Sequence, residues 1–296
     1  MPLSCLLRSV TTRLCGTLLL ALPAAARAAS PLDIELTWVT LGSEPYTISS
    51  GKLAGQGVMD LIVAAIHPRL SSRPPQQVHA MAARIEMEMH KPGTRCTTSL
   101  LPTPTREQYL IFSQPYEQIL PNGLITLKWR QHFLTPYRAA NNTIQLSKLL
   151  QNPGYKLGVS MARAFGGSIN TVLQPYLDKQ AGNVVQLSGI TNLKMRRSGR
   201  IDFFLGYPYD QYDNVGVPNE MARDTVFLPL AEGGGLLPAT MACQRTEQGK
   251  QVVALFNSLL QEDKALRRSL VVAYERWLSP SAIVTLHNML RQEATQ

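Results

Sequence analysis

The residues best placed to do chemistry lie within 99–116, which reads SLLPTPTREQYLIFSQPY. Arg106 follows a Thr-Pro-Thr turn and precedes the apolar run Leu110–Phe112. A guanidinium is planar and presents its N–H donors in a rigid fork, so an arginine at the mouth of a turn can hold a carboxylate through two hydrogen bonds. The segment therefore predicts a site for a small acid, anchored by Arg106. The alternative is that Arg106 is only a surface charge on a helix.

Three aromatic residues are candidates for the walls of such a site: Trp38, Tyr46 and Tyr116. Aromatic rings provide large, rigid surfaces on which a bound molecule can stack. Each of the three could instead pack in a core. Trp38, on a strand that we expect to be buried, fits core packing at least as well.

The sequence predicts no metal site and no cofactor. None of the five histidines stands in an H-x-x-x-H or H-E-x-x-H pattern, and no C-x-x-C is present. The glycine run 233–235 is not followed by the G-K-[ST] of a phosphate-binding loop, and no G-x-S-x-G nucleophile motif occurs.

The first 28 residues have the pattern of a secretory signal peptide. Arg8 and Arg13 precede an apolar stretch over 14–26, and Ala26-Arg27-Ala28 forms an A-x-A cleavage site. The apolar stretch is shorter than the ~20 residues that a membrane-spanning helix needs. We therefore expect residues 1–28 to be removed on export, rather than kept as an anchor.

The charge of the chain argues against a nucleic-acid partner. The full sequence has 29 Lys and Arg against 20 Asp and Glu, a net charge of +9. Removal of residues 1–28 takes away three arginines and no acids, which lowers this charge to +6. The remaining basic residues form no block and do not alternate with aromatic residues, as nucleic-acid-binding segments often do. The excess could favour an anionic solute, although ordinary surface lysines and arginines explain it equally well.

Two cysteines remain after cleavage, Cys96 and Cys243. In an oxidising compartment such a pair can form a disulfide. The sequence does not show that the two are close in space, so two buried free thiols are an equally open alternative.

The elements that must position these residues alternate along the chain. An apolar-periodic helix is predicted over 58–66, a strand rich in β-branched residues over 123–129, and an amphipathic helix over 246–260. Between 156 and 205 three strands alternate with two helices, which is typical of a parallel sheet covered by helices. Residues 78–89 stay ambiguous between strand and helix. The mature length suffices for two lobes.

In their order, these segments resemble the bacterial solute-binding proteins of family three, the polar amino-acid binders of ABC importers. The family pattern T-x-x-R, short helix, F-[ST]-x-x-Y is matched by TPTR ending at Arg106 and by FSQPY ending at Tyr116. Further matches follow in the family's order: EPY with GKLAG (44–46 and 51–55), KLGV (156–159), GRID (199–202) and TEQG (246–249).

The resemblance implies an α/β, two-lobed, periplasmic-binding-protein-like (type II) fold. Each lobe would be a mixed, mostly parallel sheet flanked by helices, with a hinge between the lobes and the solute enclosed in the cleft. Lobe 1 would hold 29–128 plus 225–296, and lobe 2 would hold 129–224. The chain would cross between lobes near 124–129 and return near 226–230, and closure would be a hinge motion.

The resemblance also implies roles for individual residues. In the family the arginine that matches Arg106 grips the α-carboxylate of the ligand. Ser99 falls where the family uses a small hydroxyl, and Tyr207 is a candidate from the second lobe. Arg163 stands in a loop that usually reads G-[ST]-[ST], so it could add a second cation to the cleft.

One departure concerns the group that would bind a ligand's ammonium. In amino-acid binders an aspartate follows the strand that begins with GRID, but here the position falls near Gly206 and Tyr207, and the nearest acid is Asp210. Two arginines without an ammonium acceptor favour an anion or an aromatic acid over a zwitterion.

The resemblance implies a non-catalytic periplasmic solute-binding protein. Its partners would be a small-molecule solute and an ABC permease or membrane sensor, and the protein would be a monomer without a cofactor. One alternative is an exported enzyme on the same scaffold, similar to cyclohexadienyl dehydratases. Such an enzyme would need an acid in the cleft, for which Glu44 is the candidate. Another alternative is a degenerate binding fold used only for protein contacts.

Overall fold

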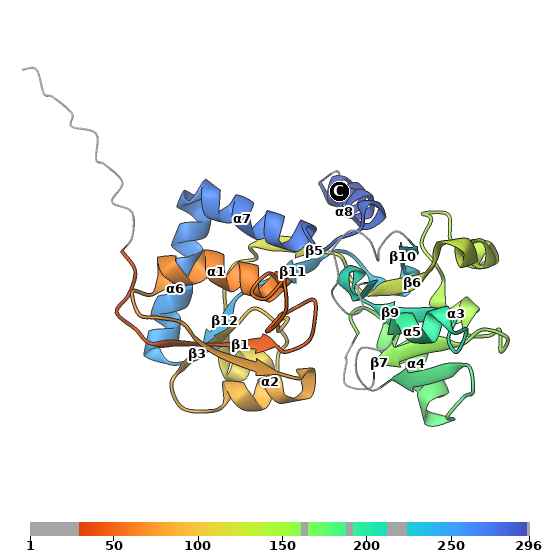
Figure 1. Ribbon diagram of the computed structural model, residues 1–296, viewed down its shortest axis with the longest axis horizontal. Coiled ribbons are helices and arrows are strands. Elements are labelled where there is room, and N and C mark those ends of the chain that lie inside the picture. Colours follow the sequence, from red (N-terminus) through yellow and green to blue (C-terminus); the bar gives the residue numbers. More distant parts are fainter. Residues whose placement is uncertain (1–29, 161–164, 188–191, 212–223, 295–296) are drawn as a thin grey trace, which may run out of the picture.

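The computed structural model describes residues 30–160, 165–187, 192–211 and 224–294. The predicted signal peptide therefore lies outside the described residues. The described chain forms two lobes side by side, each built on one five-stranded sheet (Figure 1). In this part of the chain no helix is both long and apolar enough to cross a membrane.

The sheet of the first lobe combines strands from both ends of the chain. Its strand order is β2-β1-β3-β12-β4. Strand β1 runs parallel to β2 and β3, and β12 runs antiparallel to β3 and β4. The bounds of these strands are β1 Leu36–Leu41, β2 Gln76–Ala80, β3 Thr94–Thr97, β4 Leu110–Phe112 and β12 Ala242–Gln244.

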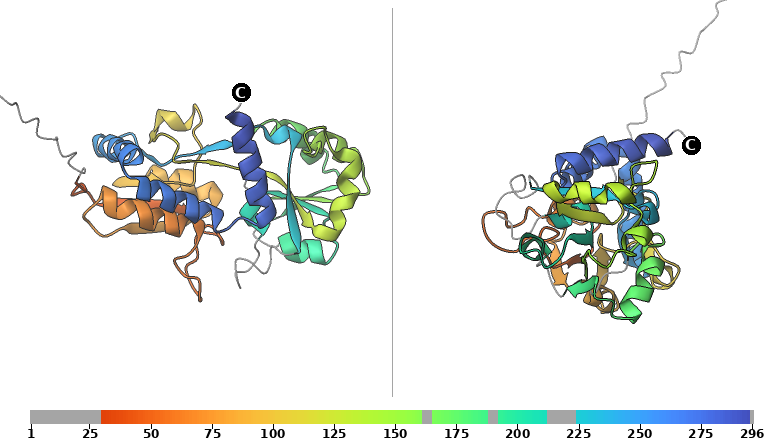
Figure 2. Two further views of the ribbon diagram at one scale, coloured as in Figure 1. Left: turned by 90° about the horizontal axis from the view of Figure 1, so that it is seen from above. Right: turned by 90° about the vertical axis from the view of Figure 1, so that its right-hand side faces the viewer.

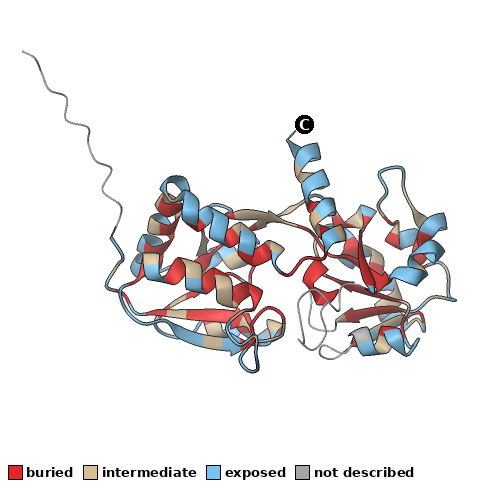
Figure 3. Ribbon diagram, turned by 45° about the horizontal axis from the view of Figure 1, so that its top comes forward, coloured by how far each residue is buried: buried red, intermediate tan, exposed pale blue. Residues whose placement is uncertain are grey.

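Helices cover both faces of this first sheet. Helix α2 (Ala82–Met89) packs on one face, and α1 (Val58–Leu70) and α6 (Glu247–Glu262) pack on the other. Helix α7 (Lys264–Glu275) lies outside them, against α1 and α6 (Figure 1). The apolar residues of α1 recur with helical spacing, so one side of the helix is buried and the other is partly to fully exposed (Figure 3). The side chain of Thr246 caps α6 by accepting a hydrogen bond from the amide of Gly249 at 3.1 Å.

The sheet of the second lobe has the order β10-β6-β9-β7-β8. Its side chains alternate between two cores, because successive strand residues point to opposite faces. In β6, Leu124 enters one apolar cluster and Ile125 enters the other. The strands are β6 Gly123–Leu127, β7 Leu157–Ser160, β8 Val184–Leu187, β9 Phe203–Gly206 and β10 Thr225–Pro229.

Helices α3 (Leu146–Leu149) and α4 (Ile169–Asp178) cover one face of the second sheet, and α5 (Asn192–Arg197) packs beside β6 and β9. Among the described strands, each large sheet has two parallel and two antiparallel pairs. Both sheets are therefore mixed, as expected, but parallel pairs are not the majority that the strand–helix alternation predicted.

The connection between the lobes differs from the predicted one. A two-stranded antiparallel ribbon, β5 (Glu117–Ile119) with β11 (Leu237–Ala239), precedes β6 and follows β10. Strands β6 and β10 were expected at the crossing points, but they are paired with each other inside the second sheet. Their almost fully buried residues need a sheet with two covered faces, which the ribbon between the lobes does not provide.

The C-terminal helix α8 (Pro280–Glu293) also departs from the predicted boundary, because it packs against β10 of the second sheet rather than on the first lobe. Figure 2 shows it lying across the second lobe beside the junction. Leu286 of α8 and Phe227 of β10 belong to the same apolar cluster as the core of α1 and α6. One continuous core therefore runs through both lobes.

Cys96 and Cys243 are joined by a disulfide. They are directly opposed on the antiparallel strands β3 and β12, although 147 positions separate them in the sequence. Both are fully buried, so the bond lies in the core of the first lobe.

Candidate functional site

A pocket of about 770 Å³ lies between the two lobes. The first lobe contributes residues of α1, α2 and the segment after β3, and the second contributes the loop at 165–166 and the turn after β9. Most of the lining is apolar or aromatic. The described residues that line it are Leu41, Tyr46, Val58, Met59, Ile62, Ala82, Ile85, Glu86, Met87, Thr98, Ser99, Leu100, Leu101, Pro102, Thr103, Arg106, Tyr116, Ile119, Phe165, Gly166, Tyr207, Tyr209, Ala239, Thr240 and Tyr274.

Arg106 begins a short 3-10 turn (Arg106–Gln108) and lines this pocket. The hydroxyl of Thr103 fixes the start of the turn by accepting a hydrogen bond from the Arg106 amide at 3.3 Å. The guanidinium donates through Nη1 to the Leu101 carbonyl at 2.8 Å, and through Nε and Nη2 to Oε1 of Glu86 at 3.0 and 2.7 Å. Its side chain keeps 22% of its surface exposed. The guanidinium is therefore held in a fixed orientation at the pocket.

Glu86 also lines the pocket, although no sequence motif marks it. It projects from α2, its side chain is 46% exposed, and its second oxygen, Oε2, accepts a hydrogen bond from the hydroxyl of Tyr109 at 3.3 Å. Burial, and then the neighbouring Glu86, raise the pKa of Tyr109, so this hydroxyl remains a donor at neutral pH. Within the described lining, Glu86 and Arg106 are the charged residues, and they neutralise each other.

Tyrosines form the wall of the pocket nearest the junction. The Tyr46 ring packs edge-on against Tyr209 with centroids 4.8 Å apart, and Tyr207 stacks on Tyr209 at 5.5 Å. Tyr209 also meets Tyr274 edge-on at 6.1 Å. Burial raises the pKa of Tyr209 well above its ordinary value, so its hydroxyl stays uncharged at neutral pH. The wall therefore offers aromatic surface without charge.

Two further predicted residues line the same pocket. Tyr116 packs edge-on against Phe256 at 6.2 Å. Ser99 accepts a hydrogen bond from the amide of Leu41 at 3.2 Å, which places its hydroxyl beside the end of β1. The pocket thus brings together Arg106, Tyr46, Tyr116, Ser99 and Tyr207.

The remaining predicted site residues lie elsewhere. Trp38 is fully buried in the core of the first lobe, where its indole N–H donates to Nδ1 of His67 at 2.9 Å, so core packing accounts for it. Glu44 does not line the pocket. Arg163 falls outside the described residues, although Phe165 and Gly166, close to it in sequence, are lining residues.

Asp210, the acid nearest the expected ammonium-binding position, is buried at the junction and does not line the pocket. Its Oδ2 accepts a hydrogen bond from the Tyr207 amide at 2.7 Å, and its Oδ1 accepts one from the hydroxyl of Tyr46 at 3.4 Å. Since Tyr46 belongs to the first lobe and Asp210 to the second, this contact bridges the lobes. The described part of the second lobe contributes no acid to the pocket.

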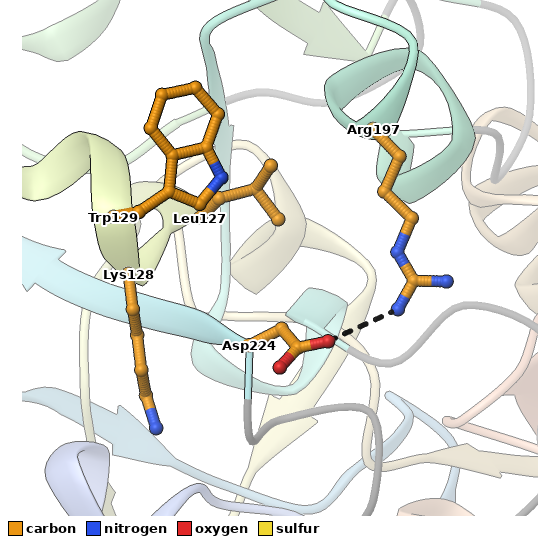
Figure 4. Close-up of a pocket in the computed structure, with 5 residues that line it drawn as sticks. All are labelled: Leu127, Lys128, Trp129, Arg197 and Asp224. Atoms are coloured by element: carbon orange, nitrogen blue, oxygen red, sulfur yellow. Dashed lines mark ion pairs between the residues drawn. The ribbon is translucent and has the colours of Figure 1, made fainter.

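A second pocket, of about 490 Å³, opens on the second lobe at the end of β6 (Figure 4). Trp129 and Arg197 stand on either side of Leu127, and Nη2 of Arg197 lies 3.6 Å from Oδ2 of Asp224. Both partners of this ion pair are more than half exposed, so water screens their attraction. Over the described residues, no group of three His, Cys, Asp or Glu side chains is arranged to hold a metal ion.

No family model matches this sequence, and no curated protein matches it by sequence. Solved structures match it by fold. An amino acid ABC transporter substrate-binding protein, AbpA, from Streptococcus pneumoniae bound to L-arginine aligns with a TM-score of 0.50 at 14% identity, covering 82% of this chain and 95% of that one.

Two other solved structures align over a similar length. An arginine transport system periplasmic binding protein from Legionella pneumophila has a TM-score of 0.51 at 13% identity, covering 83% of this chain and all (100%) of that one. The ancestral amino acid-binding protein AncCDT-1, described as a precursor of cyclohexadienyl dehydratase, has a TM-score of 0.52 at 14% identity, covering 82% and 95%. At these identities the likeness shows the fold: a two-lobed type II periplasmic-binding-protein fold.

Proposed function

We propose that this two-lobed protein is a solute-binding protein that captures a small, carboxylate-bearing molecule between its lobes without transforming it. The observation that carries the proposal is the position of Arg106, whose partly exposed guanidinium lines the pocket between the lobes. Neighbours in fold that are named as amino-acid-binding proteins support the same class of function.

The pocket has the composition of a small-molecule site. It is largely apolar and aromatic, it carries a few polar groups, and its volume of about 770 Å³ suits a small organic solute. Of the N–H groups on the Arg106 guanidinium, three donate to Glu86 and Leu101, which leaves two for a ligand carboxylate. The apolar walls would strengthen that interaction by excluding water.

The expected partners follow from the predicted export signal and the fold. An exported binder of this shape would present its solute to an ABC permease or to a membrane sensor, and it would act in the periplasm. Closure would bring Tyr207 and Phe165 of the second lobe onto a solute already held by Arg106 of the first lobe.

The proposal is tested by a thermal-shift screen of carboxylic acids and amino acids, followed by calorimetric titration of each hit. Substitution Arg106→Ala should weaken binding by about 2–5 kcal/mol, because it removes a partly desolvated charged contact. The matched control is Arg84→Ala, which removes an exposed arginine of α2 outside the pocket and should leave affinity unchanged. Equal affinities of the Arg106→Ala and wild-type proteins would contradict the proposal.

One observation favours the enzymatic alternative: AncCDT-1, which is similar in fold, is described as a precursor of cyclohexadienyl dehydratase. Such chemistry needs an acid positioned in the cleft. Glu86 is the acid that lines the described pocket, but its carboxylate is engaged by Arg106 and Tyr109. Turnover of a prephenate-like acid would favour the enzyme, and binding without turnover would favour the solute-binding protein.

A further inference from the structure

We infer that Glu86 determines which solutes the pocket accepts: the first lobe alone would recognise both charged groups of a zwitterion, with the carboxylate on Arg106 and the ammonium on Glu86. This inference rests on the proposed function and names the ligand class of the same site. It replaces the sequence-based expectation of an anion, which depended on finding no acceptor for an ammonium group.

The first observation is that Arg106 and Glu86, although paired with each other, can each form further hydrogen bonds. Oε1 of Glu86 accepts two hydrogen bonds from Arg106, whereas Oε2 accepts one, from Tyr109. A carboxylate oxygen has two lone-pair sites, so Oε2 can accept a further hydrogen bond. The side chain is 46% exposed at the pocket and the guanidinium retains two N–H groups. A donor and an acceptor of opposite charge therefore stand side by side.

The second observation is the charge balance of the lining. One positive and one negative side chain line the described pocket, and the rest of its lining is neutral. A simple anion bound to Arg106 would place uncompensated negative charge beside Glu86, and a simple cation bound to Glu86 would face Arg106. Uncompensated charge is costly where apolar walls exclude water. A zwitterion leaves the site neutral and satisfies both groups.

The third observation concerns the second lobe, whose described lining is uncharged. Asp210 is engaged by Tyr46 and by the Tyr207 amide, so it is directed to the junction rather than the pocket. Phe165 and Tyr207 instead offer ring surfaces. The charged end of the solute would therefore lie toward α2, and an apolar or aromatic body would fill the space between the lobes.

The test uses three probes of one shape that differ in charge: L-phenylalanine, 3-phenylpropanoate and 2-phenylethylamine. Binding of each is titrated to the wild-type protein, to Glu86→Gln and to Glu107→Gln. In Glu86→Gln the amide oxygen of the new side chain can still accept from Arg106, so the substitution removes charge while keeping the acceptor. Glu107 is exposed and lies outside the pocket, so Glu107→Gln is the matched control for loss of one negative charge.

We expect wild type and Glu107→Gln to bind L-phenylalanine more tightly than either singly charged probe. In Glu86→Gln, affinity for L-phenylalanine should fall about tenfold or more, since a charge-assisted hydrogen bond becomes a neutral one, while affinity for 3-phenylpropanoate should rise. If Glu86 only positioned Arg106, Glu86→Gln would weaken the binding of L-phenylalanine and of 3-phenylpropanoate together. Opposite changes in the two affinities therefore show that Glu86 itself binds the ammonium group.

Equal weakening of both carboxylate probes, or an unchanged preference in Glu86→Gln, would overturn this inference and leave the proposed function intact. Tighter wild-type binding of 3-phenylpropanoate than of L-phenylalanine would overturn it as well. Failure of all three probes, together with failure of every acid in the screen, would overturn the proposed function and this inference with it.

Discussion

At the scale of single residues, what Arg106 can bind depends on which of its N–H groups are already used. Glu86 and the Leu101 carbonyl hold the guanidinium still, which removes much of the entropy that a free arginine would lose on binding. The contact with Glu86 also sets the net charge of the pocket lining. A pocket with Arg106 alone would attract anions, whereas a pocket with the Arg106–Glu86 pair is neutral overall.

The sequence predicted some of these residues because a local pattern marked them. Arg106 and Tyr116 stand at the two ends of one compact motif, and Tyr46 adjoins a turn-rich loop. Glu86 had no such pattern, since the stretch 78–89 holds the end of β2 and all of α2, and neither strand nor helix periodicity runs through it. Trp38 was a candidate that lies in the core instead. An aromatic residue on a strand can pack in a core or line a pocket, and the sequence does not distinguish the two.

A residue-scale prediction concerns the bridge between Tyr46 and Asp210. Substitution Tyr46→Phe removes the hydroxyl that donates to Asp210 and keeps the ring against Tyr209. We expect the free energy of unfolding to fall by about 1–3 kcal/mol, because a buried acceptor loses a donor. Chemical denaturation measures this change.

The control for the bridge is Tyr137→Phe, which removes a tyrosine hydroxyl that bonds Asn152 within the second lobe. Small-angle scattering of the unliganded proteins should show a larger radius of gyration for Tyr46→Phe than for this control. Unchanged scattering together with unchanged stability would mean that the bridge does not hold the lobes together.

At the scale of elements, the most regular patterns gave the most reliable predictions. The strand expected over 123–129 is β6, and the helix expected over 246–260 is α6. Strands β4 and β5 were not predicted, because each has only three residues and so shows no periodic pattern. The apolar run 236–243 is shared by β11 and β12, which belong to different sheets. A sequence pattern shows that such a run is buried but does not show which partner covers it.

An element-scale prediction concerns Glu232, which stabilises the start of α3. Its two oxygens accept hydrogen bonds from the amides of Leu146 and Ser147 at 2.9 and 2.8 Å. Burial alone would raise the pKa of Glu232, but these backbone hydrogen bonds outweigh it and lower the pKa from the ordinary 4.5. We expect Glu232→Gln to cost about 1 kcal/mol of stability at neutral pH.

The pH dependence of that cost follows from the sign of the shift. Because the folded-state pKa lies below the ordinary 4.5, the carboxylate's stabilisation is fully present at neutral pH and is lost as the pH falls through the folded-state pKa. Denaturation from pH 7 to pH 3 should therefore show the wild-type advantage shrinking below about pH 4.5. Glu35→Gln, at an exposed acid, should show little cost at any pH, and a constant cost for Glu232→Gln would refute this explanation.

At the scale of the whole molecule, the two lobes are not independent bodies joined only by a ribbon. Helix α8 continues the chain from the first lobe and packs on β10 of the second, and one apolar cluster includes both. The order of the sequence motifs predicted two lobes. It could not place the boundary between them, because β6, β10 and α8 read as apolar elements whichever lobe they cover.

A whole-molecule prediction concerns the packing of α8. Leu286 is 2% exposed and belongs to the shared core, whereas Val284 on the same helix is 59% exposed. Leu286→Ala should lower the free energy of unfolding by about 2–5 kcal/mol, because it leaves a cavity in that core. Val284→Ala is the matched control and should change stability by less than about 0.5 kcal/mol. Thermal and chemical denaturation measure both variants. Equal losses of stability in Leu286→Ala and Val284→Ala would show that α8 is not part of a shared core.

The strand order of the first sheet has a consequence for assembly during synthesis. Every strand of the second sheet lies within residues 123–229, so that sheet can close as soon as this stretch has emerged. Strand β12, near residue 243, lies between β3 and β4 in the first sheet and joins β4 to the rest of it. Any chain that stops short of it leaves two unpaired edges open to pairing with other molecules. Prematurely terminated products should therefore aggregate through their N-terminal half, even where their later half is natively folded.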